Sequence, residues 1–201
     1  MDNLTLKRFS QLIDNGQEKL IIGGLTGIEK ENLRLSQAGF IAQTPHPENF
    51  GAALTHASIT TDYSEALMEF ITPPFSQTTD SLNYLNKIHQ FVYDHLPDEF
   101  LLAASMPCGI DGDRSIPIAQ YGSSNIGQMK HIYRQGLGHR YGRTMQAIAG
   151  IHFNYSIPEP LWPALQTLNK NPLSEQDFIA EQYFNLIRNF LNQGWLLLYL
   201  F

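Results

Sequence analysis

Hydrophobic residues recur with helical spacing in three parts of the chain. The first stripe predicts an amphipathic helix over residues 4–15, which ends near Gly16. The second predicts a helix over residues 80–97, with one apolar face that would cover a sheet. The third follows Ser174, a helix-capping residue type with Asp177 three positions later, and predicts a helix that ends near Gly194.

Other segments have the patterns of strands and turns. Residues 20–33 are strand-like but interrupted by glycines, and residues 36–39 predict a hairpin turn into Phe40 and Ile41. Residues 60–72 are partly strand-like until two prolines stop them. Residues 150–157 alternate most clearly, which predicts a strand with one face in the core and one polar face. The apolar positions are Ile151, Phe153, Tyr155 and Ile157, and the polar positions are His152, Asn154 and Ser156.

Length, charge and cysteine content narrow the function. With 201 residues and 43% hydrophobic residues, the chain can bury a sizeable core as a single unit. Its 13 Lys and Arg against 19 Asp and Glu give a net charge of −6, which disfavours binding to nucleic acid. Cys108 is the only cysteine, so a disulfide framework and a zinc site of several thiolates are excluded. We interpret Cys108 as a small buried residue in a reducing compartment.

No targeting signal or membrane anchor is apparent. The first 20 residues mix apolar and charged side chains, so we read neither a signal peptide nor a transit peptide and expect a cytoplasmic protein. The apolar run at 195–201 has seven residues, whereas about 20 are needed to cross a bilayer. Because this run resembles an element without its packing partner, we expect an incomplete protein.

Acidic residues are concentrated in the strand-like segments. Glu29 and Glu31 are two residues apart, so in a strand their carboxylates share a face about 7 Å apart along the backbone. Glu65, Leu67 and Glu69 repeat this spacing in the second segment, so Glu65 and Glu69 would also share a strand face, with Asp62 just before them. Acidic residues form strands poorly and are costly to bury, and a hard cation such as Mg²⁺ would resolve this conflict. A solvated strand face is the alternative.

Two further segments contain residues suited to binding. His152 could be a metal ligand, a phosphate contact, a general base or simply a hydrogen-bonded residue. Residues 109–141 form either a long functional loop or several short elements. The part from 120 to 146 is rich in arginine and glycine, which suits carboxylate or phosphate recognition or a polar surface loop. It contains neither a P-loop nor a dinucleotide-binding fingerprint.

Several of these segments together resemble the amino-terminal part of proteobacterial glutamate–cysteine ligase. The similar motifs occur in the same order and cover the chain from about Gly27 onward. They are GIEKENLR (27–34), LTHASITTDYSEALMEFITP (54–73), SMPC (105–108), AQYGSSNIG (119–127), IYRQGLGHRYG (132–142) and MQAIAGIHFNYS (145–156).

The resemblance implies both a fold and a reaction. The fold would be α+β, an antiparallel sheet flanked by helices that forms part of a glutamine synthetase-like catalytic fold. The reaction would join the γ-carboxylate of glutamate to cysteine through a γ-glutamyl phosphate, with ATP as co-substrate and Mg²⁺ or Mn²⁺ as the metal. This is the first step of glutathione biosynthesis.

The resemblance also implies roles for particular residues. Those that match the metal-binding shell are Glu29, Glu31, Asp62, Glu69 and His152, with Glu65 as a neighbour. Those that match the amino-acid pockets, the cysteine pocket in particular, are Tyr63, Tyr133, Arg134, Leu137 and Gln146. Two positions depart from the usual pattern, because Lys30 replaces a frequent Arg and Tyr63 stands where Phe also occurs.

Family members are much longer than this chain, and the additional length carries further ligands and arginines. We therefore expect the 201-residue chain to be inactive alone. The ligase interpretation implies glutamate, cysteine and ATP as partners, with no nucleic acid or membrane. The family is monomeric, whereas a sheet with open edges can associate. The alternatives are a non-catalytic remnant or binding module with a partial metal or amino-acid pocket, and a metal-dependent hydrolase.

Overall fold

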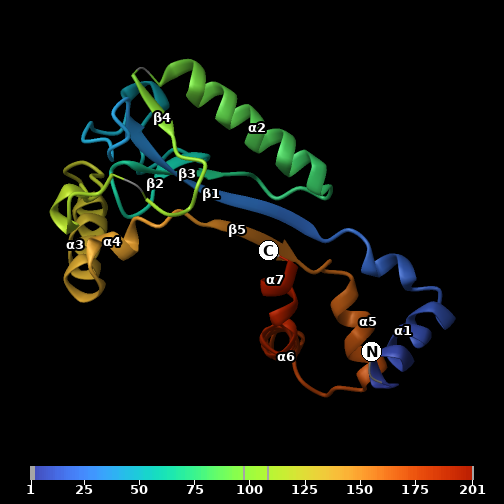
Figure 1. Cartoon of the computed structure of the whole chain (residues 1–201). Helices are drawn as coiled ribbons and strands as arrows, with labels where there is room; N and C mark the ends of the chain where they lie inside the picture. Colours follow the sequence, from blue (N-terminus) through green and yellow to red (C-terminus); the bar gives the residue numbers. More distant parts are fainter. Residues whose placement is uncertain (1–2, 97, 108, 201) are drawn as a thin grey trace. The chain divides into compact units, whose positions relative to one another are not determined.

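The computed structural model describes residues 3–96, 98–107 and 109–200. Within these residues the chain forms two compact units (Figure 1). The sheet unit is Leu25–Tyr155, and the helical unit joins the described residues of 1–24 to those of 156–201. Cys108, interpreted above as a buried thiol, lies outside the described residues.

An antiparallel sheet forms the centre of the sheet unit. The longest strand, β1, pairs with β3, β4 and β5, and β2 pairs with β3. The pairings of β1 with β3 and β4, and of β2 with β3, are antiparallel. The predicted class, an antiparallel sheet with flanking helices, is therefore confirmed. The strands are β1 (Leu25–Ser36), β2 (Ile59–Thr61), β3 (Leu67–Ile71), β4 (Glu99–Leu101) and β5 (Ile151–Ser156).

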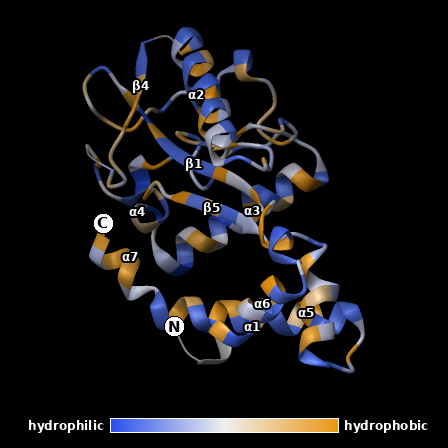
Figure 2. Cartoon of the chain, turned by 90° about the vertical axis from the view of Figure 1, so that its right-hand side faces the viewer, coloured by the Kyte–Doolittle hydropathy of each residue, from blue (hydrophilic) through white to orange (hydrophobic). Residues whose placement is uncertain are grey.

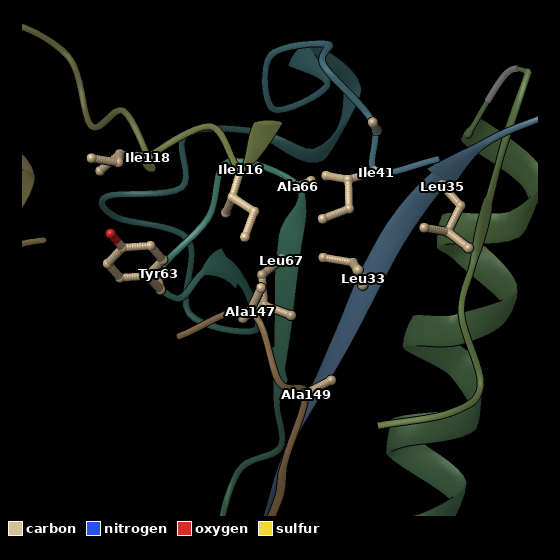
Figure 3. Close-up of a cluster of buried hydrophobic side chains, with 11 residues drawn as sticks. Leu33, Leu35, Ile41, Tyr63, Ala66, Leu67, Ile116, Ile118, Ala147 and Ala149 are labelled. Atoms are coloured by element: carbon tan, nitrogen blue, oxygen red, sulfur yellow. The ribbon is translucent and has the colours of Figure 1, made fainter. Parts of the chain in front are cut away.

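The two faces of the sheet are covered differently, because side chains alternate along each strand. On one face, Ile28, Met68 and Phe70 pack with buried residues of helix α2 (Thr78–His95). On the other face, Leu33 and Leu67 belong to a cluster that also contains Ala147 and Ala149 (Figure 3). The odd-numbered residues of β1 lie on this second face, so the buried cluster occupies one end of it and Glu29 and Glu31 the other.

One expectation for the strands needs correction, and two others are confirmed with more detail. The strand expected over 20–33 begins only at Leu25, and a 3₁₀ turn at Glu18–Ile21 precedes it. Glycines separate the two elements, and Gly23 has φ of +109°. The predicted turn at 36–39 forms, but it returns through an isolated bridge between Leu35 and Ile41 and not through a strand. Residues 60–72 contain two paired strands, β2 and β3.

A 17-residue helix, α3 (Asn125–Tyr141), occupies half of the segment expected to be a loop or several short elements. A 3₁₀ turn, Asp113–Ser115, precedes it and helix α4 (Arg143–Gln146) follows it. The Ser124 hydroxyl caps α3 by accepting a hydrogen bond from the Gly127 amide at 3.1 Å. The hydrophobic pattern did not predict α3 because its large apolar residues Ile126, Met129 and Ile132 are exposed and do not form a buried stripe.

The helical unit contains α1 (Asn3–Asp14), α5 (Leu161–Asn169), α6 (Glu175–Gln193) and α7 (Trp195–Leu200). The first and third of these helices agree with the predicted ranges. Its core includes buried Trp162, whose ring lies 5.2 Å from that of Tyr183, and buried Phe178. Much of the apolar stripe of α6 and α7 is exposed, and the hydrophobic residues there are visible in Figure 2. In the described part of the chain no helix is both long enough and apolar enough to cross a membrane.

Candidate metal centre

Strand register brings the predicted acidic residues together on one face of the sheet. Glu31 of β1 lies directly opposite Glu69 of β3 in the antiparallel ladder. Directly opposed residues share a face, and residues two apart in a strand share a face, so Glu29 joins them. Glu69 is also opposite Thr60 of β2. The sheet therefore holds three carboxylates from two strands on one surface.

Strand β5 adds an imidazole and two hydrogen-bond donors to this surface. His152 Nδ1 donates to Glu29 Oε2 at 3.2 Å, and Asn154 Nδ2 donates to Glu29 Oε1 at 2.9 Å. The amide of Gly150 donates to Glu31 Oε2 at 2.6 Å. When the neutral imidazole carries its proton on Nδ1, the lone pair of Nε2 is available to a metal ion. A carboxylate that orients a metal-binding imidazole in this way is a common arrangement.

The geometry of this group fits a divalent cation. One ligand atom each from Glu29, Glu69 and His152 lie within 4.8 Å of one another. Around an octahedral Mg²⁺ with ligands at about 2.1 Å, ligand atoms are separated by about 3–4 Å, so small side-chain rotations suffice. Carboxylates suit Mg²⁺ and Mn²⁺, and an imidazole adds preference for the transition metal.

The electrostatics of the group favour a bound positive charge. Burial, together with the charges of Asp62, Glu29 and Glu31, raises the pKa of Glu69 to about 7. Burial also raises the pKa of Glu31, although the Gly150 hydrogen bond opposes this. The hydrogen bond to Glu29 raises the pKa of His152. When no cation is bound, the raised pKa values therefore favour the protonated forms of Glu31, Glu69 and His152.

Changing Glu69 to Gln should stabilise the metal-free chain at pH 8. The folded pKa of about 7 lies above the ordinary glutamate value of 4.5, so between these values the native state holds more protons than the unfolded state. Stability contributed by this group therefore falls as pH rises from about 4.5 to 7, and the penalty is fully present above 7. The shift corresponds to at most about 3 kcal/mol, and solvent screening reduces this to about 1–2 kcal/mol.

Urea unfolding in EDTA at pH 8 and pH 5 measures this effect. We expect Glu69→Gln to raise the free energy of unfolding at pH 8 and to change it little at pH 5. Glu48→Gln, at an exposed glutamate outside the cluster, is the matched control and should be neutral at both values. An equal effect of Glu69→Gln at the two pH values would show that the carboxyl is not under electrostatic strain.

Asp62 and Glu65 lie in the connection between β2 and β3 and have different surroundings. Besides burial, which is the largest cause, the charge of Asp62 raises the pKa of both Glu31 and Glu69, so its carboxylate lies near the cluster. Glu65 is buried, and its two oxygens accept hydrogen bonds from the His46 amide at 2.9 Å and the Gln120 amide at 2.6 Å. The expectation that Glu65 shares a strand face with Glu69 is wrong, because Glu65 precedes β3 and its carboxylate holds two loops.

The predicted substrate residues lie around α3. Arg134 Nε donates to the carbonyl of Asp62 at 2.5 Å, and its guanidinium lies 4.8 Å from the centre of the Tyr121 ring. Leu137 packs against the buried cluster that contains Tyr63. The Tyr63 hydroxyl points out of that cluster (Figure 3), and a Cβ on Gly138 would collide with it. α3 is therefore tied at Arg134 to the segment that carries Asp62.

The other two predicted substrate residues have no such link to Tyr63 or Asp62 among the described residues. Tyr133, on α3, is exposed. Gln146 is half-buried at the end of α4. Among the described residues, no hydrogen bond, ion pair or ring contact joins either of them to Tyr63. The structure therefore brings together three of the five predicted residues, through the Tyr63 cluster and the Asp62 segment.

Sequence reasoning missed the residues that hold the acidic side chains in place. The Gly150 amide contacts Glu31 and the Asn154 amide contacts Glu29, yet a glycine and an asparagine carry no strong chemical signal. The alternation in β5 indicated the face of Asn154 but not its partner.

The expectation for the apolar face of β5 is wrong. Ile151, Phe153 and Tyr155 are 68%, 60% and 52% exposed, although the alternation predicted that they would lie in the core. The pattern identified the strand and its two faces correctly. It could not show whether other parts of the protein pack against the apolar face.

Comparison with known proteins gives consistent matches. A family model described as "Glutamate-cysteine ligase" matches residues 9–201. A glutamate–cysteine ligase of Alcanivorax borkumensis is 51% identical over 195 residues, which cover 97% of this chain and 37% of that relative. A glutamate–cysteine ligase of Pseudomonas fluorescens is 50% identical over 201 residues, which cover all of this chain and 38% of the relative.

Solved structures give matching folds. A glutamate–cysteine ligase of Francisella tularensis in complex with AMP has a TM-score of 0.80 and 39% identity, over 87% of this chain and 34% of that one. A bifunctional glutathione synthetase of Pasteurella multocida has a TM-score of 0.86 and 34% identity, over 96% of this chain and 25% of that one. The chain thus spans 37–38% of the length of the two curated relatives.

Proposed function

Because the chain belongs to the glutamate–cysteine ligase family, we propose that it supplies the metal-binding face of an ATP-dependent ligase. In this reaction ATP phosphorylates the γ-carboxylate of glutamate, and the amine of cysteine then displaces phosphate to form the γ-glutamyl amide. The observation that carries the proposal is the convergence of Glu29, Glu31, Glu69 and His152 on one face of the sheet.

We assign the metal to Glu29, Glu69 and His152, with Glu31 and Asp62 beside them. Bound Mg²⁺ or Mn²⁺ would neutralise the phosphates of ATP and the transferring phosphoryl group. The protein groups position the ligands in advance. Asn154 fixes one oxygen of Glu29, and Gly150 fixes one oxygen of Glu31. These side chains therefore lose less conformational freedom when the metal binds.

We assign the amino-acid side of the site to Tyr63, Tyr133, Arg134, Leu137 and Gln146. Arg134 supports this assignment because its Nη2 lies 3.9 Å from Asp62 Oδ1 and its Nε bonds the Asp62 carbonyl. The guanidinium thus stands at the border between the acidic cluster and α3. There it can orient a carboxylate or phosphate oxygen next to the metal ligands.

A chimera tests this function. The part of the Alcanivorax ligase that aligns with this chain is replaced by the 201 residues, and ADP release is measured with Mg²⁺, ATP and glutamate, with and without cysteine. We expect cysteine-dependent turnover in the chimera and a loss of at least about 100-fold on Glu29→Gln, with Glu48→Gln unchanged. A folded chimera without turnover would overturn the ligase assignment and favour a non-catalytic binding module. The 201-residue chain alone should show no turnover.

A further inference from the structure

Tyr121 lies at the junction between helix α3 and the connection from β2 to β3. It belongs to the AQYGSSNIG motif (119–127), and only 6% of the residue is exposed. Its hydroxyl lies 2.6 Å from the Thr61 carbonyl oxygen and 3.0 Å from the Asp62 carbonyl oxygen. Burial raises the pKa of this hydroxyl, so at neutral pH it keeps its proton and shares it between the two carbonyls. Because Thr61 is the last residue of β2, the hydroxyl fixes the backbone where Asp62 leaves the sheet.

Arg134 of α3 meets the same backbone carbonyl. Its Nε donates to the Asp62 carbonyl at 2.5 Å, and its guanidinium lies 4.8 Å from the centre of the Tyr121 ring. Its Nη1 donates to the Lys130 carbonyl at 3.2 Å. Among the described residues, Nη2 makes no hydrogen bond and lies 3.9 Å from Asp62 Oδ1. The ring and the shared carbonyl therefore fix the guanidinium and leave one nitrogen for an anionic ligand.

The backbone around Tyr121 is itself held by the surrounding fold. The Gln120 amide donates to the buried Glu65 carboxylate at 2.6 Å. A Cβ on Gly127 would collide with the Tyr121 carbonyl oxygen, so the start of α3 packs directly against this backbone. The position of the Tyr121 ring is therefore set by the fold and not by the groups that its hydroxyl bonds.

We propose that Tyr121 is a positioning residue of the ligase reaction, a role that rests on the function proposed above. Its hydroxyl holds the backbone of Asp62 near the acidic cluster, and its ring holds the guanidinium of Arg134. One side chain thus sets the separation between the metal-binding face and the cation assigned to the amino-acid side. Phosphoryl transfer depends on such positioning, and a misplacement of about 1 Å can lower a rate about 100-fold.

A tyrosine with a purely structural role provides the matched control. The Tyr84 hydroxyl of α2 lies 3.0 Å from Ser58 Oγ, and Tyr84 packs against the cluster on the face of the sheet that α2 covers. Tyr84→Phe and Tyr121→Phe each remove one hydrogen-bonded hydroxyl and keep the ring. We therefore expect similar small changes in melting temperature from the two substitutions, and an effect on metal binding only from Tyr121→Phe.

A double-mutant cycle on the 201-residue chain tests whether Tyr121 acts through Asp62. Isothermal titration calorimetry measures Mn²⁺ affinity for Tyr121→Phe, for Asp62→Asn and for the double variant. Tyr121→Phe alone should lower the affinity at least about fivefold, because it loosens a residue beside the metal ligands. In the chain that already carries Asp62→Asn, the same change should lower it less than about twofold, since the carboxylate to be positioned is gone. Tyr84→Phe should leave the affinity unchanged.

The chimera described above provides the second measurement, in which ADP release is followed at increasing Mg²⁺ concentration. Tyr121→Phe should lower kcat at least about tenfold and raise the Mg²⁺ concentration for half-maximal rate at least about fivefold. Loss of folded protein alone would lower kcat and leave that Mg²⁺ concentration unchanged.

Two results would each overturn the proposal. One is an equal loss of Mn²⁺ affinity with and without Asp62→Asn, and the other is a Mg²⁺ dependence that Tyr121→Phe does not change. Failure of the ligase assignment has a different signature, because the unsubstituted chimera would then show no turnover. The Mn²⁺ cycle needs neither ATP nor turnover, so in that case it still decides whether Tyr121 positions Asp62.

Discussion

Replacing Arg34 by Met is expected to lower the free energy of unfolding by about 3–5 kcal/mol. The Arg34 side chain is 1% exposed, and its Nη1 donates to Glu99 Oε2 at 2.7 Å. Its Nη2 donates to the carbonyls of Thr44, Pro45 and Glu65 at 2.9–3.2 Å. Methionine has a similar volume but no donors, so the substitution leaves a largely buried carboxylate and several carbonyls without their partner.

Urea unfolding at pH 7.5 measures the loss, and Arg114→Met is the matched control. Arg114 is exposed, so its substitution should change the free energy of unfolding by less than about 0.5 kcal/mol. Arg34→Lys should still destabilise, because an ammonium cannot reach the planar set of acceptors that the guanidinium bonds. A loss below 1 kcal/mol for Arg34→Met would mean that water enters and replaces the guanidinium.

The Arg34 cluster links the stability of the sheet to the geometry of the candidate site. Arg34 bonds the carbonyl of Glu65, and the Glu65 carboxylate in turn holds the amides of His46 and Gln120. This segment begins at Asp62, one of the predicted metal residues. Loosening it would therefore move Asp62 relative to Glu69, so Arg34 acts on the site through position and without contact to a metal or substrate.

Strand periodicity predicted the acidic face well because it depends on local geometry. Glu29 and Glu31 share a face in any strand, and the alternation around His152 gave the faces of β5. The pairing of Glu31 with Glu69 depends on register between segments 38 residues apart, which no local pattern specifies. Only the resemblance to a known family joined these segments before the structure did.

Two failures of sequence reasoning have physical causes. α3 has its large apolar residues on exposed surface, so the pattern that marks a buried helix face is absent there. Glu65 and Glu69 are both glutamates at positions that would share a face of one strand. The chain turns before β3, however, and directs the Glu65 carboxylate to backbone amides.

Changing Glu29 to Gln is expected to lower the affinity of the 201-residue chain for Mn²⁺ by at least about 100-fold. Glutamine keeps the volume of the side chain but removes the negative charge and weakens the acceptor that orients His152 Nδ1. Loss of an outer hydrogen bond to a ligand typically lowers metal affinity 10–100-fold, and loss of a ligand carboxylate should reach the upper end or exceed it. Isothermal titration calorimetry at pH 7.5 measures the Mn²⁺ affinity of the variant and of the unsubstituted chain.

Asn154→Ala tests whether the orientation of the Glu29 carboxylate matters separately from its charge. In the described part of the chain, its side chain hydrogen-bonds only to Glu29 Oε1, so the substitution leaves every carboxylate in place. We expect a loss of about tenfold, between that of Glu29→Gln and that of the exposed control Glu48→Gln, which should be unchanged. Equal affinities for Glu29→Gln and Glu48→Gln would show that Mn²⁺ responds to net charge alone. The graded order would instead place the ion at the surface shared by β1, β3 and β5, where the side chains of three strands converge.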